Sequence, residues 1–131
     1  MSPGLRVAAR GVAVLFLGGS ALAEAGGLPG EWAGSVTTMQ QVVVLGELGM
    51  ILAGLVGAAG VMLRRAWAVP AAVAWAASTT LAGGLAPRAF GNTPWSVSAT
   101  AAVVCVLIGT AVVWLTRAGV RAPVGSAPVP R

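Results

Sequence analysis

The sequence predicts an all-α integral membrane protein, a bundle of four transmembrane helices with the N-terminus and the C-terminus in the cytoplasm. The chain has 131 residues, of which 57% are hydrophobic and only 8% are charged, whereas soluble domains carry about 25% charged residues. Its apolar residues form four runs, and a helix needs about 20 such residues to cross a bilayer. The placement of the arginines then indicates which ends of the helices face the cytoplasm.

The first predicted helix, residues 5–23, is the shortest of the four. It needs the side chain of Arg10 to extend along the helix to the membrane surface. A basic start, a short apolar stretch and the small residues Ala21 and Ala23 are also typical of a signal peptide that is cleaved after Ala23. We expect a retained helix, with cleavage as the alternative.

Residues 24–38 are expected to form the longest outer loop. Gly26, Gly27, Pro29 and Gly30 lie in this segment, and such a cluster predicts a break in the helix.

The second and third helices are predicted at residues 39–63 and 66–85. Only a short turn around Arg64 and Arg65 separates them, so they are expected to form an antiparallel hairpin. Trp75 lies in the middle of the third run and is expected to pack inside the bundle.

The fourth helix is predicted at residues 95–116, between Pro94 and Arg117. Residues 1–120 thus form a single four-helix transmembrane domain. Residues 121–131 are rich in Pro, Gly, Ala and Ser and are expected to be a disordered cytoplasmic tail.

Seven of the eight arginines fall on one side of the membrane in this topology, and only Arg88 falls on the other. Loops rich in arginine stay in the cytoplasm, which predicts a multi-pass protein of the inner (plasma) membrane. The arginines lie at the ends of the apolar runs, so the net charge of +5 reflects topology. The lipid bilayer is therefore the expected partner, and no nucleic acid is.

Glu47 is a single carboxylate inside the second apolar run. A charge at the centre of a bilayer costs roughly 2.5–3.5 kcal/mol on insertion scales, and such residues mark functional sites by default. In the functional interpretation, Glu47 lines a small polar site with Gln40 or Gln41 and exchanges a proton there. In the structural interpretation, it is a packing device bonded to a hydroxyl of Ser78, Thr79 or Thr80, or to an arginine.

The chain has few other residues that could form a chemical site. The chain has no histidine and one cysteine, Cys105, so neither an intramolecular disulfide nor a metal or haem site is expected. Arg10 is the one charge of the first helix that could reach inward, and it is a further candidate for the ligand or proton site. We predict no catalytic residue.

Small residues form a stripe on the second helix. Gly46, Gly49, Ala53, Gly57 and Gly60 fall within about 80° of arc at 100° per residue. Such a stripe lets another helix approach closely, either within the chain or in self-association.

Two segments resemble the DoxX and DoxX-like membrane proteins. Arg10-Gly11, followed by Phe16 and Gly19, resembles the first helix of that family. The stretch Gly46-Glu47-Leu48-Gly49, followed by Leu52, Gly54, Leu55, Gly57 and Arg65, resembles its second helix. The resemblance covers residues 5–73, and the Ala-rich third helix departs from the pattern.

The DoxX resemblance implies a four-helix membrane fold and a role as an accessory subunit of an oxidoreductase-type membrane assembly. Other membrane subunits are then the partners and a quinone is the candidate cofactor. Arg10 and Glu47 are the charged positions that match. Two alternatives stay open. One is a small proton-coupled transporter using Glu47. Small multidrug-resistance proteins are transporters that also have four short helices and one essential membrane glutamate, but they carry that glutamate in the first helix. The other is a purely structural protein for helix packing and assembly.

Overall fold

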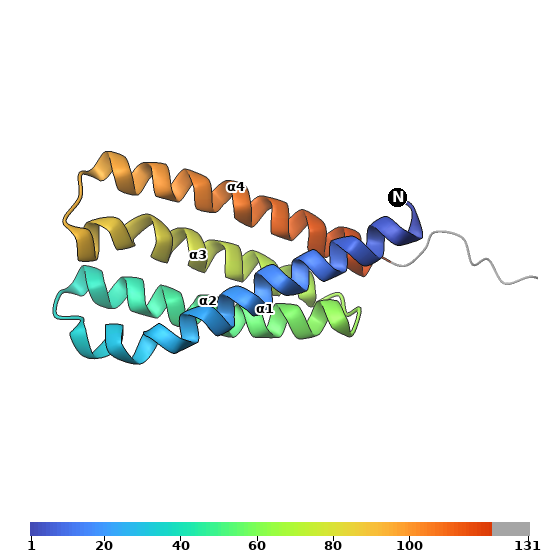
Figure 1. Ribbon diagram of the computed structural model, residues 1–131, viewed down its shortest axis with the longest axis horizontal. Coiled ribbons are helices and arrows are strands. Elements are labelled where there is room, and N and C mark those ends of the chain that lie inside the picture. The colour runs from blue at the N-terminus through green and yellow to red at the C-terminus, as the bar shows by residue number, and fades with distance from the viewer. Residues whose placement is uncertain (122–131) are drawn as a thin grey trace, which may run out of the picture.

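The computed structural model describes residues 1–121, and this part of the chain is all-helical. The four helices are α1 (Pro3–Gly34), α2 (Thr38–Met62), α3 (Ala68–Gly91) and α4 (Trp95–Val120) (Figure 1). Each is long and apolar enough to cross a membrane, so the prediction of an all-α chain with four long apolar helices is confirmed for the described residues. The predicted disordered tail, residues 121–131, lies outside the described residues apart from Arg121.

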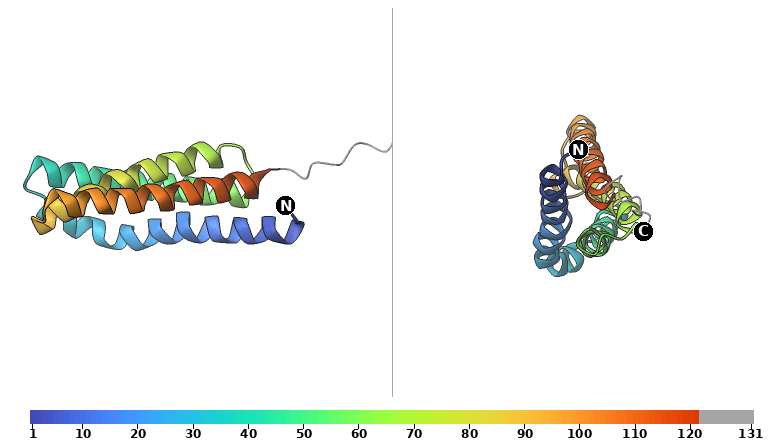
Figure 2. Two further views of the ribbon diagram at one scale, coloured as in Figure 1. Left: turned by 90° about the horizontal axis from the view of Figure 1, so that it is seen from above. Right: turned by 90° about the vertical axis from the view of Figure 1, so that its right-hand side faces the viewer.

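The helices run up and down along the long axis of the molecule (Figures 1 and 2). The N-terminus, the α2–α3 turn and the last turn of α4 lie at one end, which we call the termini end. The α1–α2 and α3–α4 connections lie at the other, which we call the connection end. α3 packs between α2 and α4, while α1 crosses the bundle diagonally and contacts both α2 and α4.

α1 is longer than predicted, and the expected loop over residues 24–38 is wrong. The helix continues through Pro29 to Gly34, which leaves only Ser35 to Thr37 as the connection to α2. Proline removes only one backbone hydrogen bond, while the residues from Glu24 to Gly34 gain helical hydrogen bonds. The four carbonyls that any helix end leaves without helical partners then lie at the C-cap Ser35, whose N–H donates to the carbonyl of Trp32.

The other helix ends also shift. α3 runs past Pro87 to Gly91 and ends at Asn92, which is left-handed with φ 48° and whose N–H donates to the carbonyl of Pro87. Asparagine tolerates this conformation and is a common helix terminator. The predicted helices, residues 66–85 and 95–116, leave nine residues between them, whereas only Asn92 to Pro94 separate α3 from α4. α4 also extends four residues beyond its predicted end to Val120.

The core lies where α1 crosses the other helices. Trp75 is 2% exposed, and its indole Nε1–H donates a hydrogen bond of 3.0 Å to the hydroxyl of Ser20 on α1. The expectation that Trp75 packs inside the bundle is thus confirmed. The buried side chains of this core are Ala13, Leu17, Met50, Ala58, Val61, Ala68, Ala72, Trp75 and Val112.

Glycines on α2 allow its neighbours to approach closely. A Cβ added at Gly60 would lie 2.8 Å from the Cβ of Ala68 on α3, and one at Gly54 would lie 2.5 Å from the carbonyl oxygen of Leu17 on α1. Small residues at helix contacts are the usual means of close packing in membranes. The glycines of α2 thus set its distance from both neighbours.

Candidate functional site

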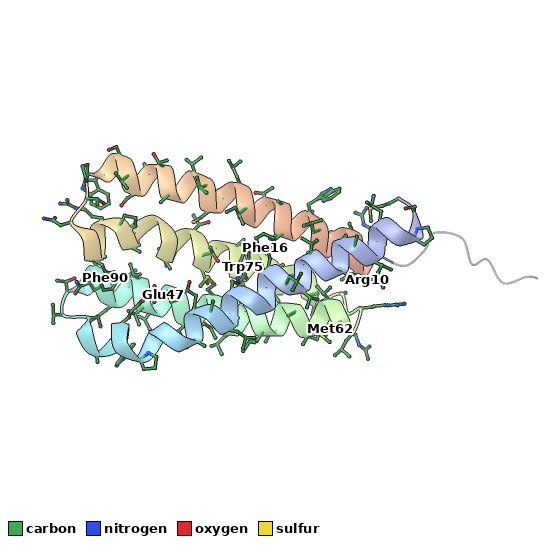
Figure 3. All side chains as sticks on the ribbon, viewed as in Figure 1. Arg10, Phe16, Glu47, Met62, Trp75 and Phe90 are labelled. Carbon is green, nitrogen blue, oxygen red and sulfur yellow. The ribbon has the colours of Figure 1, made fainter. Side chains whose placement is uncertain are left out.

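Glu47 lies on the side of α2 that faces α1. The neighbouring glycines hold α2 against α3: a Cβ at Gly46 would lie 3.2 Å from the Cβ of Ala82, and one at Gly49 would lie 2.8 Å from Ser78 Oγ. Because these two positions occupy the face that contacts α3, Glu47 projects from the flank. Its side chain is half-buried and belongs to the half of the molecule nearer the connection end (Figure 3).

The partners of Glu47 come from the last turns of α1. Ala13, Leu17 and Ala21 form the buried stripe of this helix. Glu24, Leu28 and Glu31 continue the same stripe at intervals of three and four residues, and all three are half-buried. A helix repeats its face at this spacing, so the apolar seam of α1 becomes acidic near the connection end.

Glu31 and Glu47 are in hydrogen-bonding contact, and Glu24 lies close enough to act on Glu47 electrostatically. We call Glu24, Glu31 and Glu47 the carboxyl cluster; they are all the acidic residues of the chain. An ionised carboxylate can only accept hydrogen bonds, so a bond between two carboxyl groups requires a proton on one of them. The charged neighbours that act on Glu47 are both negative. Two negative charges this close together disfavour ionisation of both carboxyl groups at once.

Gln40 and Gln41 play different parts. Gln40 completes a capping box at the start of α2, because its Oε1 accepts from the N–H of Thr37 at 3.0 Å and its backbone N–H donates to the hydroxyl of Thr37. Its Nε2 donates to the carbonyl of Ala89 on α3 at 3.1 Å. These bonds commit the Gln40 amide to joining α2 and α3 at the connection end. Gln41 is exposed.

Two of the three hydroxyl groups considered as partners of Glu47 are bonded to backbone carbonyls of their own helix. Thr79 donates to the carbonyl of Trp75 at 2.8 Å, and Thr80 donates to that of Ala76 at 2.9 Å. Each hydroxyl has one proton to donate, so neither donates to Glu47. Ser78 packs against Gly49, which is two residues beyond Glu47, on the face of α2 that contacts α3.

Arg10 lies far from Glu47, near the termini end (Figure 3). Its Nε donates a hydrogen bond to the carbonyl of Gly119 on α4. A Cβ at Gly119 would lie 2.8 Å from Arg10 Cγ, so the arginine stem is packed tightly on this glycine. Arg10 thus joins α1 to α4, and the structure does not bring the two charged candidates together.

Within residues 1–121, no group of three His, Cys, Asp or Glu side chains is placed to hold a metal ion. The carboxyl cluster is included in this statement. Cys105 is half-buried and faces α3, where a Cβ at Gly83 would lie 2.8 Å from its Sγ. Its surroundings are those of a packing residue.

Glu24 and Glu31 were missed as site residues because they were assigned to a loop. One signal in the sequence could have found them: they are seven residues apart, which places both on one face of a helix. Residues Leu17, Ala21 and Leu28 share that face. The pattern would have predicted two carboxylates at the helix seam.

Comparison with family models, with curated proteins and with solved structures gave no match to this chain. The resemblance to the DoxX family therefore rests on the motifs of the first two helices alone.

Proposed function

We propose that the protein is a DoxX-like accessory subunit of an oxidoreductase-type assembly in the plasma membrane, and that it relays protons there. The observation that carries the proposal is the close approach of the carboxyl groups of Glu47 and Glu31 in the seam between α1 and α2. A carboxyl pair that shares one proton can take up and release a second one. Reduction of a quinone by a partner enzyme consumes protons and oxidation of a quinol releases them, and such a pair suits that need.

The arginine distribution supports an orientation for this relay. Arg6, Arg10, Arg64, Arg65, Arg117 and Arg121 belong to the termini end or its flanking turns. With that end in the cytoplasm, the carboxyl cluster lies in the outer half of the membrane. Protons would then be exchanged with the outer surface.

The exposed faces of α1 and α4 support association with another subunit. These two helices bury the smallest share of their surface within the bundle. Large apolar side chains such as Leu15, Leu22, Val103 and Leu107 are exposed on them. In an assembly, these faces are available to a partner helix or to lipid.

Transport of a cation is a second candidate function. The charged neighbours of Glu47 are Glu24 and Glu31, so a cation could bind without displacing an arginine. This observation favours a proton-coupled transporter over the purely structural alternative, in which Glu47 serves only packing.

The test compares the wild type with Glu47→Gln, and uses Glu24→Gln as the matched control. Each protein is purified from native membranes in mild detergent, and co-purifying subunits and quinone-dependent turnover are measured. We expect the same partners in all three samples and a turnover lowered about a hundredfold by Glu47→Gln, in the range of lost general acid–base catalysis. Glu24→Gln, which leaves the hydrogen-bonded pair intact, is expected to stay near the wild type.

Three results contradict the proposal in different ways. Glu47-dependent movement of a cation by the purified protein in liposomes identifies a transporter. A silent Glu47→Gln variant, combined with loss of the assembly in Gly57→Leu, identifies a structural protein. A redox partner that is absent from the wild-type sample removes the accessory role.

A further inference from the structure

An apolar groove lies in the seam between α3 and α4 on the surface of the bundle. It has a volume of about 750 Å³ and is lined mainly by Val, Ala, Leu and Thr side chains of both helices. Two threonines of this lining, Thr80 and Thr110, donate their hydroxyl protons to carbonyls of their own helices. The walls are therefore suited to a hydrocarbon chain.

Small residues form the floor of the groove. A Cβ added at Gly109 would lie 2.7 Å from the Cβ of Ala76, so the two helices touch at this level. Ala76 and the exposed Ala77 are the small side chains on the α3 wall. The two helices are thus in contact at the floor of the groove, and the groove is open toward the surface of the bundle.

The groove ends at a basic group. Arg117 lines the groove and also lines a second cavity of about 330 Å³ beyond it, together with Arg121, Ala66 and Val69. Arg117 is thus common to an apolar groove and to a pocket with two arginines. Guanidinium groups bind phosphate oxygens through paired, charge-assisted hydrogen bonds.

We propose that this groove binds an anionic phospholipid, with an acyl chain along α3 and α4 and the phosphate at Arg117 and Arg121. Eleven residues separate Val106 from Arg117 along the lining of α4, which is about 16 Å of helix. This is about half of the ~30 Å hydrocarbon thickness, the depth of one leaflet.

Charge selects the lipid over a second copy of the chain. The termini end carries arginines from α1, α4 and the α2–α3 turn. A second chain lying parallel in the groove would bring another basic end to Arg117, whereas an anionic head group neutralises the charge already there. The binding site is independent of the carboxyl cluster, which lies between α1 and α2.

Trp114 provides the probe, because it lines the groove one turn from Arg117 and is 61% exposed. The full chain is reconstituted in phosphatidylcholine vesicles in which about a tenth of the lipid is brominated near the head-group end of its acyl chains. The brominated lipid is phosphatidylglycerol in one set and phosphatidylcholine in the other. The contribution of Trp114 is the difference in quenching between the wild type and Trp114→Phe. This difference reports the lipid in the groove.

We expect the Trp114 signal to be quenched several-fold more by the brominated phosphatidylglycerol. The double variant Arg117→Gln/Arg121→Gln is expected to abolish this preference, since each arginine near an anionic surface contributes roughly a fivefold change in affinity. The matched control Arg6→Gln/Arg64→Gln removes the same charge outside the groove and is expected to keep the preference. Equal quenching by both lipids in the wild type, or equal loss in the two double variants, would overturn the proposal.

A second pair of variants tests the groove itself. Ala77→Phe fills the groove and is expected to reduce Trp114 quenching by both lipids. Ala74→Phe adds the same ring at an exposed position of α3 outside the groove lining and is expected to have little effect. If Ala77→Phe leaves the quenching and its lipid preference unchanged, the acyl chain does not lie in the groove. Circular dichroism is used to check that each variant has the same helix content as the wild type, and a variant that does not is left out of the comparison.

Discussion

Replacing Gly54 by alanine tests how closely α1 is packed on α2. The added Cβ would lie 2.5 Å from the carbonyl oxygen of Leu17 and 3.1 Å from the Cβ of Ala21. Ordinary contact begins near 3.4 Å, so α1 must move away by about 0.9 Å. The obstructing oxygen belongs to the backbone and cannot rotate aside. Overpacking of this kind costs about 1–3 kcal/mol, and alanine returns up to ~1 kcal/mol in helix propensity. We expect a net loss of up to about 2 kcal/mol in the free energy of unfolding, and a loss of about 1–3 kcal/mol relative to a Gly→Ala change that meets no neighbour.

Two matched glycine variants make the test specific. A Cβ at Gly57 first meets the Cδ1 of Leu17 at 3.2 Å, the end of a flexible side chain, and a Cβ at Gly19 meets nothing within 4 Å. Unfolding in mixed micelles with increasing dodecyl sulfate, followed by circular dichroism, should rank Gly54→Ala as least stable. Gly57→Ala should be intermediate and Gly19→Ala equal to the wild type or better. A Gly54→Ala protein as stable as Gly19→Ala would refute the packing described for α1.

Three further predictions concern side-chain hydrogen bonds. Gln40→Ala should lower stability by about 1–2 kcal/mol in the same unfolding assay, because it removes a capping box and a bond to α3; the exposed Gln41→Ala serves as its control and should be near neutral. Trp75→Phe and Ser20→Ala should show a coupling of about 0.6 kcal/mol in a double-mutant cycle, the average for hydrogen bonds between membrane helices, and strictly additive effects would argue against the bond. Arg10→Ala should speed hydrogen exchange of the last turn of α4, to which Arg10 is bonded, and unchanged exchange there would show that the bond does not hold the two helices together.

The number of helices could be predicted from the sequence because each helix corresponds to one apolar run. Helix ends are set by something else, namely local hydrogen bonding. α2 begins at the capping box of Thr37 and Gln40, close to its predicted start at residue 39. α1 has no comparable stop near Ala23, so it continues through Pro29 to Gly34.

The same local effect explains what was missed in the candidate site. Glu47 could be singled out because an isolated charge in an apolar run is unusual. Glu24 and Glu31 become its partners only when α1 extends as a helix past Ala23 and lies beside α2. The pairing of Arg10 with Gly119 depends on the diagonal crossing of α1, which arises from the glycine contacts of three helices together. A tertiary angle of this kind is not contained in the periodicity of one segment.

The depth of Glu47 has an electrical consequence. Glu47 lies five residues inward of Val42, where the apolar run of α2 begins, which is about 8 Å along the helix axis and about a quarter of a ~30 Å hydrocarbon layer. In the proposed membrane orientation, a proton that reaches Glu47 from the connection end would cross about a quarter of the membrane field. At about 2.3 kcal/mol per elementary charge for each 100 mV across the whole membrane, the proton occupancy of Glu47 would be biased by roughly 0.6 kcal/mol per 100 mV. The proposed proton site would therefore respond to voltage as well as to pH.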